Sequence, residues 1–560
     1  MKSKIKILLA LIVFFAFCLR FWQIGQFPAG LNADEASYGY NAYSLIMTGK
    51  DEHGESWPIH LKSFADYKPA GTAYILLPFV RLFGLNVTAI RFPSALAGAL
   101  SVLLIFLLVQ ELFSNYHLSL ITSFFLSISP WHIHFSRGAW ETNLATTFML
   151  FGLWLFFKGL KNPKFFVFSI LSLVFSMYTY HTPRVILPLL GVFLVTFYKK
   201  ELFKYFPPKA DPPWVEKWLV ISGLLAIVLL TPLLLSFLGP AGSARFSGVS
   251  IFSDTGPFWE VNRSRGEHLD LNSLPVRLLH NRPIVYSLKF LENYLDHFDG
   301  VFLFLLGDRI ERSNPPDMGE MYLFDLIFFL AGLYFFFKLR PQHWWFPFVW
   351  LALAPITAAL TFQTPNALRA HNMVIPLIII SSYGIYHLVI SIKKKFSLSL
   401  FVVCSTAKWQ ALLMFFVLFI SWNFAYYLHQ YYVHYPKAYP AAWEFGIEEL
   451  VDYLWPIRND YAKIYVTEQY DQPYIIFLFY LQYPPEKFQQ EVVLTQRDKF
   501  GFSTVRDFDN FHFENIIWDD LKNKENALVC GTDNEIPEVA NIVKEINFRN
   551  GKPAFQCAKI

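Results

Sequence analysis

Charged residues are scarce in this sequence. Asp, Glu, Lys and Arg make up 16% of its 560 residues, against about 25% in an average soluble protein. The hydrophobic set reaches 54%, and many apolar runs approach the roughly 20 residues that cross a bilayer core. The composition therefore excludes an ordinary soluble enzyme and predicts a polytopic membrane protein.

Cysteine is also rare, and its spacing carries no metal signal. The four cysteines lie at Cys18, Cys404, Cys530 and Cys557. None of these positions has the spacing of a metal-ligand set. Cys530 and Cys557 share the C-terminal region, where they form a disulfide if that region faces an oxidising space, and otherwise remain free thiols.

Three further absences narrow the function. The net charge is only +4 and no dense basic stripe with interleaved aromatics occurs, which argues against a nucleic-acid partner. No Gly-rich phosphate-binding loop is present, which argues against a soluble nucleotide donor. Charges are nearly absent from the middle of the apolar runs, with Arg20 as the main exception, so an ion-coupled transporter is disfavoured.

The apolar runs predict an all-α membrane domain of the polytopic type. We expect eleven spanning helices. Residues 71–85 and 281–306 form either further spans, which would give 11–13 in all, or interfacial helices. The expected spans lie near 5–26, 90–112, 117–135, 143–160, 164–180, 184–198, 217–238, 321–339, 344–362, 370–391 and 408–430. The first resembles a signal peptide but lacks a small-residue cleavage site, so we interpret it as an uncleaved span.

Basic residues gather in alternate loops and set the expected orientation. The loops on one side hold Lys2, Lys4, Lys6, Lys158, Lys161, Lys164, Lys199, Lys200, Lys204, Lys209, Lys217, Lys338, Arg340, Lys393, Lys394, Lys395 and Lys408. By the positive-inside rule this side and the N-terminus are cytoplasmic. We therefore expect an integral protein of the plasma (inner) membrane, with outer loops at 27–89 and 239–320 and an extracytoplasmic C-terminal region.

Two domains are expected. Residues 1–435 form the transmembrane domain with its outer loops. Residues 436–560 alternate helical and strand-like pieces such as KIYVTE, PYIIFLFYLQY and ALVCG, which predicts a small extracytoplasmic α/β domain.

The first outer loop is the most polar stretch near a span. It reads NADEASYGYNAYSLIMTGKDEHGESWPIHLKSFADYKP over residues 32–69. Residues 33–48 predict a short helix along the membrane surface. Asp34 falls at or near its N-cap, where free amide groups favour a carboxylate. The interpretation of Asp34 as a helix cap alone remains open.

Acids and cations gather on the outer rim of the expected spans. The acids are Asp34, Glu35, Asp66 and Glu141, and the cations are Lys68, Arg137, Arg184, Arg369 and His371, with His181 beside them. Structural alternatives stay open: Arg137 between tryptophans is typical of a headgroup anchor, and a lone His181 is typical of a hydrogen-bonding side chain. A lipid-phosphate sugar would need cations for its phosphate and one carboxylate to take a proton from the incoming hydroxyl.

Six motifs, in order over about residues 25–440, resemble a known family. They are NADEASY, DYKPAGTAY, RFPSALAG, SPWHIHFSRGAWETN, YTYHTPRVILP and TPNALRAHN. The chain resembles the GT-C fold membrane glycosyltransferases that use polyprenyl-phosphate sugars (glycosyltransferase family 39), near the protein O-mannosyltransferases and the aminoarabinose lipid A transferases. The resemblance implies Asp34 as catalytic base, Lys68 at the lipid phosphate, and a second charged patch at Arg137 and Glu141.

The resulting hypothesis is an inverting glycosyltransferase with an outward active site. Asp34 is the expected base, and Lys68, Arg137 and Arg369 are the expected donor-phosphate ligands. The residues expected to position the sugar or acceptor are Glu35, Asp66, Glu141, His181, Arg184 and His371. The expected partners are a polyprenyl-phosphate sugar, a protein, lipid or glycan acceptor, and the bilayer.

Two alternative functions remain: a flippase or transporter of lipid-linked sugars, and a non-catalytic scaffold whose outward domain binds a partner. No cofactor is expected, since no His-rich tract or Asp-x-Asp motif adjoins the acids of the expected site. A divalent metal held by Asp34, Glu35 and Glu141 is the less favoured alternative.

Overall fold

The chain divides into two compact units. The computed structural model describes residues 3–64, 66–203, 214–239, 250–395, 407–496 and 503–560. Unit 1 comprises Met1–Phe17, Gly98–Phe135 and Thr142–Tyr427, and unit 2 comprises Cys18–Ala97, Ser136–Glu141 and Leu428–Ile560. These units differ in their bounds from the two expected domains, because the first outer loop packs with the C-terminal part of the chain.

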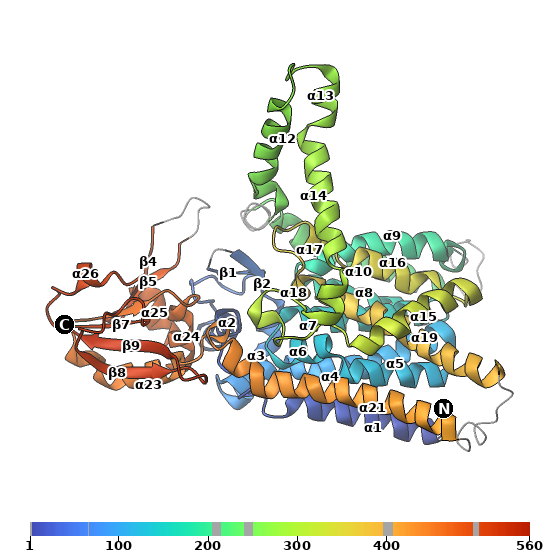
Figure 1. The fold of residues 1–560 in the computed structure, drawn as a ribbon, viewed down its shortest axis with the longest axis horizontal. Helices are drawn as coiled ribbons and strands as arrows, with labels where there is room; N and C mark the ends of the chain where they lie inside the picture. Colours follow the sequence, from blue (N-terminus) through green and yellow to red (C-terminus); the bar gives the residue numbers. More distant parts are fainter. Residues whose placement is uncertain (1–2, 65, 204–213, 240–249, 396–406, 497–502) are drawn as a thin grey trace. The chain divides into compact units, whose positions relative to one another are not determined.

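Unit 1 is built of helices, shown in Figure 1. Its helices are α5 (Tyr116–Ile128), α8 (Phe165–Thr179), α9 (Thr182–Phe203), α10 (Trp214–Ser236), α12 (Gly256–Gly266), α13 (Leu274–Leu279), α14 (Arg282–Asp296), α15 (Leu323–Leu339), α16 (Trp345–Leu353), α17 (Ile356–Ala359), α18 (Ala367–Ala370), α19 (Val374–Lys395) and, for all but its last turn, α21 (Ala407–His429). Four more helices contribute residues to both units: α1 (Ser3–Phe21), α4 (Val87–Phe113), α6 (Pro130–Arg137) and α7 (Glu141–Gly159). Each predicted apolar segment thus contains a helix.

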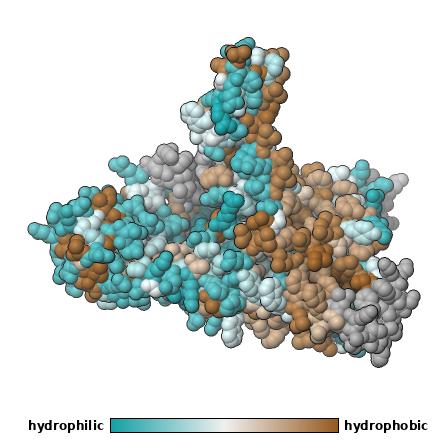
Figure 2. Space-filling model, in the orientation of Figure 1, coloured by the Kyte–Doolittle hydropathy of each residue, from teal (hydrophilic) through white to brown (hydrophobic). Residues whose placement is uncertain are grey.

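The number of spans is not confirmed. Among the described residues, three helices are long and apolar enough to cross a membrane: Val87–Phe113, Lys217–Ser236 and Ala367–Ile392. Four other apolar helices are shorter: Gly71–Phe83, Tyr116–Ile128, Phe165–Thr179 and Trp345–Ala359. Exposed apolar side chains nevertheless cover helices of unit 1, for example Val192 at 65% and Val228 at 66% exposure. Figure 2 shows the apolar surface over these helices, as expected where lipid replaces water.

Unit 2 joins the first outer loop to the C-terminal region. Its loop elements are α2 (Ala33–Thr48), β1 (His60–Ser63), β2 (Asp66–Pro69) and α3 (Gly71–Phe83). Helix α2 has the predicted bounds, but most of its side chains are buried in the protein and do not lie along a membrane surface. Tyr38, Tyr40 and Ala42 are buried in one core with Phe477 and Phe479. A partner helix more than 400 residues later in the chain explains why periodicity alone missed this burial.

The C-terminal region contains the predicted α/β domain. Its elements are α22 (Tyr435–Ala438), α23 (Ile447–Ile457), β3 (Lys463–Thr467), α24 (Pro473–Tyr480), α25 (Pro485–Glu491), β4 (Val493–Leu494), β5 (Val505–Phe508), β6 (Phe511–Glu514), α26 (Trp518–Leu521), β7 (Ala527–Gly531), β8 (Ile542–Asn547) and β9 (Pro553–Lys559). The sheet has the order β4-β5-β6-β3-β7-β9-β8. Strand β3 pairs in parallel with β6 and β7, and the other pairs are antiparallel.

Both faces of this sheet are covered by apolar side chains. Alternate residues of a strand point to opposite faces. Ile464 and Val466 of β3 accordingly enter the core that α2 and α24 share, whereas Tyr465 enters a second core with Val529 and Leu521. The first of these cores fixes the sheet against the first outer loop.

A disulfide joins two neighbouring strands of the sheet. Cys530 of β7 and Cys557 of β9 are directly paired in the antiparallel register and are bonded to each other. Both side chains are buried. The structure therefore selects the disulfide over the two free thiols, which suits an oxidising compartment.

We predict that the double variant Cys530→Ser/Cys557→Ser has a less stable C-terminal sheet. Cross-linking residues with a sequence separation of 27 lowers the entropy of the unfolded chain by an amount worth roughly 3–4 kcal/mol. Urea titration of the detergent-solubilised chain, followed by proteolysis of the sheet, measures the loss. Wild-type protein treated with a reductant should behave like the variant, and equal stability of all three samples would contradict the prediction.

Candidate functional site

An ion pair at the start of α2 brings together two of the expected site residues. The Lys68 ammonium donates to the Asp34 carboxylate. Asn32 caps the helix instead of Asp34, since its side chain accepts from the N–H of Glu35 at 3.0 Å. Asp34 is therefore not needed as the helix cap, and its carboxylate is paired with Lys68 instead.

The hairpin of β1 and β2 positions Lys68. Its register pairs Lys68 with Leu61, which is fully buried. The ammonium lies 4.5 Å from the centre of the Phe64 ring and 5.5 Å from that of Tyr38. The Lys68 side chain is 11% exposed and that of Asp34 is 30% exposed. Aromatic faces thus hold the cation, while the carboxylate stays open to an approaching molecule.

Glu35, expected to position a sugar or acceptor, is instead enclosed in the protein. Arg91 donates to its two carboxylate oxygens at 2.9 and 2.7 Å. The N–H of Ala139 donates to the same carboxylate at 2.7 Å. The side chains of Glu35 and Arg91 are 1% and 0% exposed. We therefore replace the expected substrate-binding role of Glu35 with a structural one.

Arg137, an expected phosphate ligand, is also taken up by the protein. Its guanidinium donates to the carbonyl oxygens of Leu19 at 2.7 Å and Trp22 at 2.6 Å. It also lies 5.3 Å from the ring centres of Tyr431 and Tyr432. The side chain is fully buried, so we assign it to anchoring the end of α1 and the segment after it, in place of phosphate binding.

Asp66 and Glu141 are the other two acids that were expected to contact the sugar or acceptor. Asp66 lies in β2, paired with Ser63, and its side chain lies outside the described part of the structure. Glu141 is the first residue of α7, where a carboxylate is favoured by free amide groups and the helix dipole. Their roles in substrate binding stay predictions.

Two of the expected residues in unit 1 lie at the beginning of the α18–α19 region. Arg369 of α18 is half-buried and donates to the Thr361 hydroxyl at 2.7 Å. His371 is fully buried, and its ring nitrogen Nδ1 is 3.2 Å from the Thr146 hydroxyl. This enclosure favours a packing role for His371. Arg369 keeps partial access and stays a predicted phosphate ligand.

His181 and Arg184 form a small polar group at the start of α9. The Arg184 guanidinium lies 3.4 Å from Nδ1 of His181 and donates to the carbonyl oxygen of Met177 at 2.8 Å. Both side chains are partly exposed. These residues belong to unit 1, whereas Asp34 and Lys68 belong to unit 2, so a shared site for them stays a prediction.

One buried carboxyl group of the first outer loop, that of Glu52, was not identified from the sequence. Glu52 is fully buried, accepts from the Asn41 side chain at 3.1 Å and from the Tyr474 hydroxyl, and donates its own N–H to Asn41 at 2.9 Å. Burial raises the pKa of Glu52 to about 8, although the nearby Lys68 ammonium opposes that rise. Its partner Tyr474 lies in α24, so no local pattern could have revealed the cluster.

Metal ligands form no cluster in the part of the chain that the structure describes. No group of three or more His, Cys, Asp or Glu side chains is arranged there to hold an ion. Metal independence stays a prediction.

One family model matches part of the chain. Residues 67–235 match the family described as dolichyl-phosphate-mannose-protein mannosyltransferase. The match begins next to Lys68. No curated protein sequence matches the chain.

Solved structures share the fold at low sequence identity. ArnT from Cupriavidus metallidurans in the apo state has a TM-score of 0.53 and 12% identity, over 98% of this chain and 97% of that chain. The same protein bound to undecaprenyl phosphate has a TM-score of 0.51 and 11% identity, over 99% and 98%. The oligosaccharyltransferase of Archaeoglobus fulgidus, tethered to an acceptor peptide, has 0.51 and 13%, over 87% of this chain. The chain spans only 60% of the length of that protein.

The shared fold and the partial family match agree with the resemblance to membrane glycosyltransferases that the motifs carry. The matching family is described as a mannosyltransferase and one of the solved proteins as an oligosaccharyltransferase, and both descriptions agree with the predicted reaction class.

We predict that Glu52 makes the fold less stable as pH rises. A carboxyl whose pKa is about 8 when folded and about 4.3 when unfolded stabilises the fold fully below pH 4.3, and this contribution is lost as pH rises through 8. The melting temperature of the wild type should fall between about pH 5 and pH 8, and Glu52→Gln should flatten that fall. Asp51, whose pKa burial raises to about 6, should leave a residual slope at the acid end.

Glu486→Gln is the matched control for this experiment, because Glu486 is an exposed glutamate of α25. It should keep the wild-type pH dependence. A wild-type slope that persists unchanged in Glu52→Gln would show that Glu52 is ionised in the folded protein.

Proposed function

We propose that the chain is an inverting glycosyltransferase that moves a sugar from a polyprenyl-phosphate donor to an acceptor hydroxyl. The observation that carries this proposal is the pairing of a partly exposed Asp34 carboxylate with Lys68 at the start of α2. One base and one phosphate-binding cation are the groups that a single displacement needs. The GT-C fold supports the same reaction class.

Asp34 acts on the acceptor in this mechanism. Its carboxylate accepts the proton of the acceptor hydroxyl while the hydroxyl oxygen forms a bond to the anomeric carbon of the sugar. The bond from that carbon to the phosphate oxygen breaks on the opposite side. The products are a glycoside of inverted configuration and polyprenyl phosphate, which keeps the electron pair.

Lys68 acts on the donor. In the free protein its ammonium is paired with Asp34. A donor phosphate brings a second anion to the same ammonium, and a charge-assisted hydrogen bond to phosphate is strong in a site shielded from water. Donor binding then draws Lys68 toward the leaving group and frees the lone pairs of Asp34 for the acceptor.

The proposed donor is a lipid, so the orientation of the chain in the membrane determines where the donor binds. We propose that the N-terminus is cytoplasmic and that Asp34, Lys68 and the C-terminal sheet lie on the extracytoplasmic side, as the basic loops indicate. The matched family is described by dolichyl-phosphate-mannose and one neighbour of this fold is bound to undecaprenyl phosphate. Both descriptions support a lipid-phosphate donor, with mannose as the first sugar to test.

We predict that Asp34→Asn lowers kcat by roughly 10²–10⁴-fold, the usual contribution of a general base. The amide has nearly the shape of the carboxylate but cannot take the acceptor proton. Release of polyprenyl phosphate from radiolabelled polyprenyl-phosphate sugars in detergent measures the change. A transporter would move such a donor across a liposome membrane without releasing the phosphate.

Asp519→Asn is the matched control, because Asp519 is an exposed aspartate that is also paired with a lysine, Lys522. It should transfer at the wild-type rate. Wild-type turnover in Asp34→Asn would remove Asp34 from the reaction and, with it, the proposed mechanism.

For Lys68→Met we expect donor affinity to fall. A hydrogen bond between charged groups is worth about 1.5–3 kcal/mol, which corresponds to a roughly 10- to 150-fold weaker Kd. Titration of the purified variant with undecaprenyl phosphate tests this by calorimetry. An unchanged Kd would exclude Lys68 as a phosphate ligand.

A further inference from the structure

A helical hairpin in unit 1 presents an apolar side that no other described residue covers. The hairpin consists of α12, α13 and α14. On α14, exposed apolar residues recur at Ile284, Leu288, Leu291 and Leu295, with Leu288 at 60% exposure. This spacing of four, three and four residues places them on one face of the helix. The stripe on α14 continues onto α13 through Leu274, Leu278 and Leu279, which are 60–71% exposed.

The opposite face of α14 packs against α12 and the segment before it. Arg282 lies 4.6 Å from the centre of the Phe258 ring. The Tyr286 hydroxyl donates to the carbonyl oxygen of Asp254 at 3.1 Å, and the Tyr286 ring packs on that of Phe252. The hairpin therefore has two layers, and the apolar stripe lies on the side away from α12.

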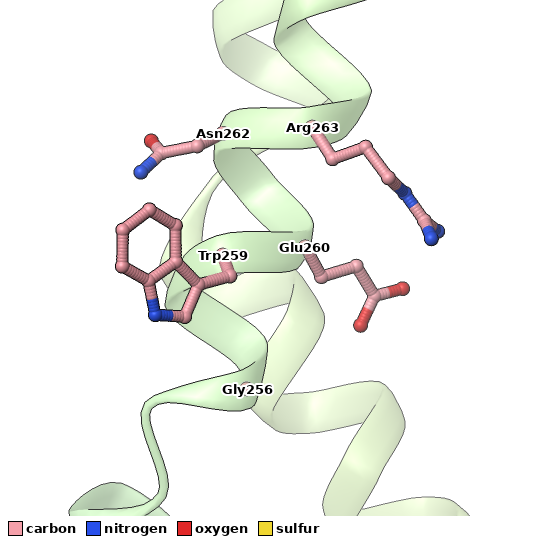
Figure 3. A pocket seen from close by; sticks show the side chains of 5 residues that line it. All are labelled: Gly256, Trp259, Glu260, Asn262 and Arg263. Carbon is pink, nitrogen blue, oxygen red and sulfur yellow. The ribbon is translucent and has the colours of Figure 1, made fainter.

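The α12 layer presents polar groups around one exposed aromatic side chain, that of Trp259. Figure 3 shows Asn262 with Trp259 on one side of α12, and Glu260 with Arg263 on the other. All four side chains are exposed. Figure 2 agrees, since polar surface follows the edge of the hairpin that carries α12 and apolar surface follows the edge that carries α14.

The hairpin lies across the direction of the bundle helices. In Figure 1, α9, α15 and α16 extend away from α14 on the side of its apolar edge. At its root, the Tyr294 hydroxyl donates to the carbonyl oxygen of Ala352 in α16 at 2.8 Å. Ala352 is near the C-terminal end of α16, whereas Lys338 and Arg340 precede the other end. The hairpin thus joins the bundle at the end opposite to these basic residues.

We propose that the α12–α14 hairpin lies along the outer surface of the lipid bilayer, with the apolar side of α13 and α14 inserted at the boundary of headgroups and acyl chains. The bundle helices cross the same bilayer. Their apolar surface and the apolar stripe of the hairpin then both face the lipid, which fills the angle between them. A helix with one apolar and one polar face is the element that lies in a membrane interface. The polar α12 layer then faces water.

Single fluorescent labels on the full chain test this orientation. Cys18 and Cys404 are replaced by Ser, and the buried disulfide is kept. A cysteine that carries an NBD group is introduced by Leu288→Cys, by Leu295→Cys on the same stripe, or by Arg263→Cys on the polar layer as the matched control. Each protein is reconstituted into phosphatidylcholine vesicles with and without lipids that carry a nitroxide near the headgroup end of the acyl chain.

We expect NBD at 288 and 295 to emit at shorter wavelength and to be quenched by the nitroxide lipids, whereas NBD at 263 is not quenched. Equal quenching at all three positions, or none at 288 and 295, overturns the proposal. A blue-shifted but unquenched label at 288 and 295 also overturns it, because protein, such as a second copy of the chain, then covers the stripe. The readout is independent of glycosyl transfer, so it stands whether or not the proposed reaction is confirmed.

Discussion

The buried ion pair between Arg91 and Glu35 fixes the part of the chain on which the proposed chemistry depends. Two charges taken out of water cost several kcal/mol each unless their hydrogen bonds are complete. Here Arg91 also donates to the carbonyl oxygens of Ile24, Pro28 and Gly30, at distances of 2.7–3.1 Å. The pair therefore holds the first turn of α2 against α4. Since consecutive helical residues point about 100° apart, burying Glu35 leaves the neighbouring Asp34 directed elsewhere, where it meets Lys68.

The C-terminal sheet has a physical role in the same site. Helix α24 packs so closely on α2 that a Cβ at Gly39 would lie 2.7 Å from the ring of Phe479. The Tyr40 hydroxyl donates to the carbonyl oxygen of Tyr483 at 3.0 Å. Any larger residue at Gly39 would push α24 away and loosen the helix that carries Asp34. The C-terminal domain thus packs over the core of the first outer loop, which explains why the two belong to one unit.

Local pattern was enough for the elements. The bounds of α2, the helices in every apolar run, and the α/β character of the C-terminal domain follow from periodicity and strand-like composition, which act over a few residues. The number of spans did not follow with the same certainty. Several apolar helices, such as α5 and α8, are shorter than a bilayer core requires, and their depth depends on how neighbouring helices and lipid receive them.

The sequence by itself indicated the resemblance to membrane glycosyltransferases and singled out Asp34 and Lys68, because both lie in motifs that are read within one loop. Only the tertiary structure decided that these two residues pair and which of the other charged side chains are enclosed in the protein. Glu35 and Arg137 look like site residues until their partners, Arg91 and the carbonyl groups of Leu19 and Trp22, are seen to enclose them. These partners are 56 and more than 100 residues away along the chain. Burial and charge pairing depend on distance in space, which a linear sequence does not record.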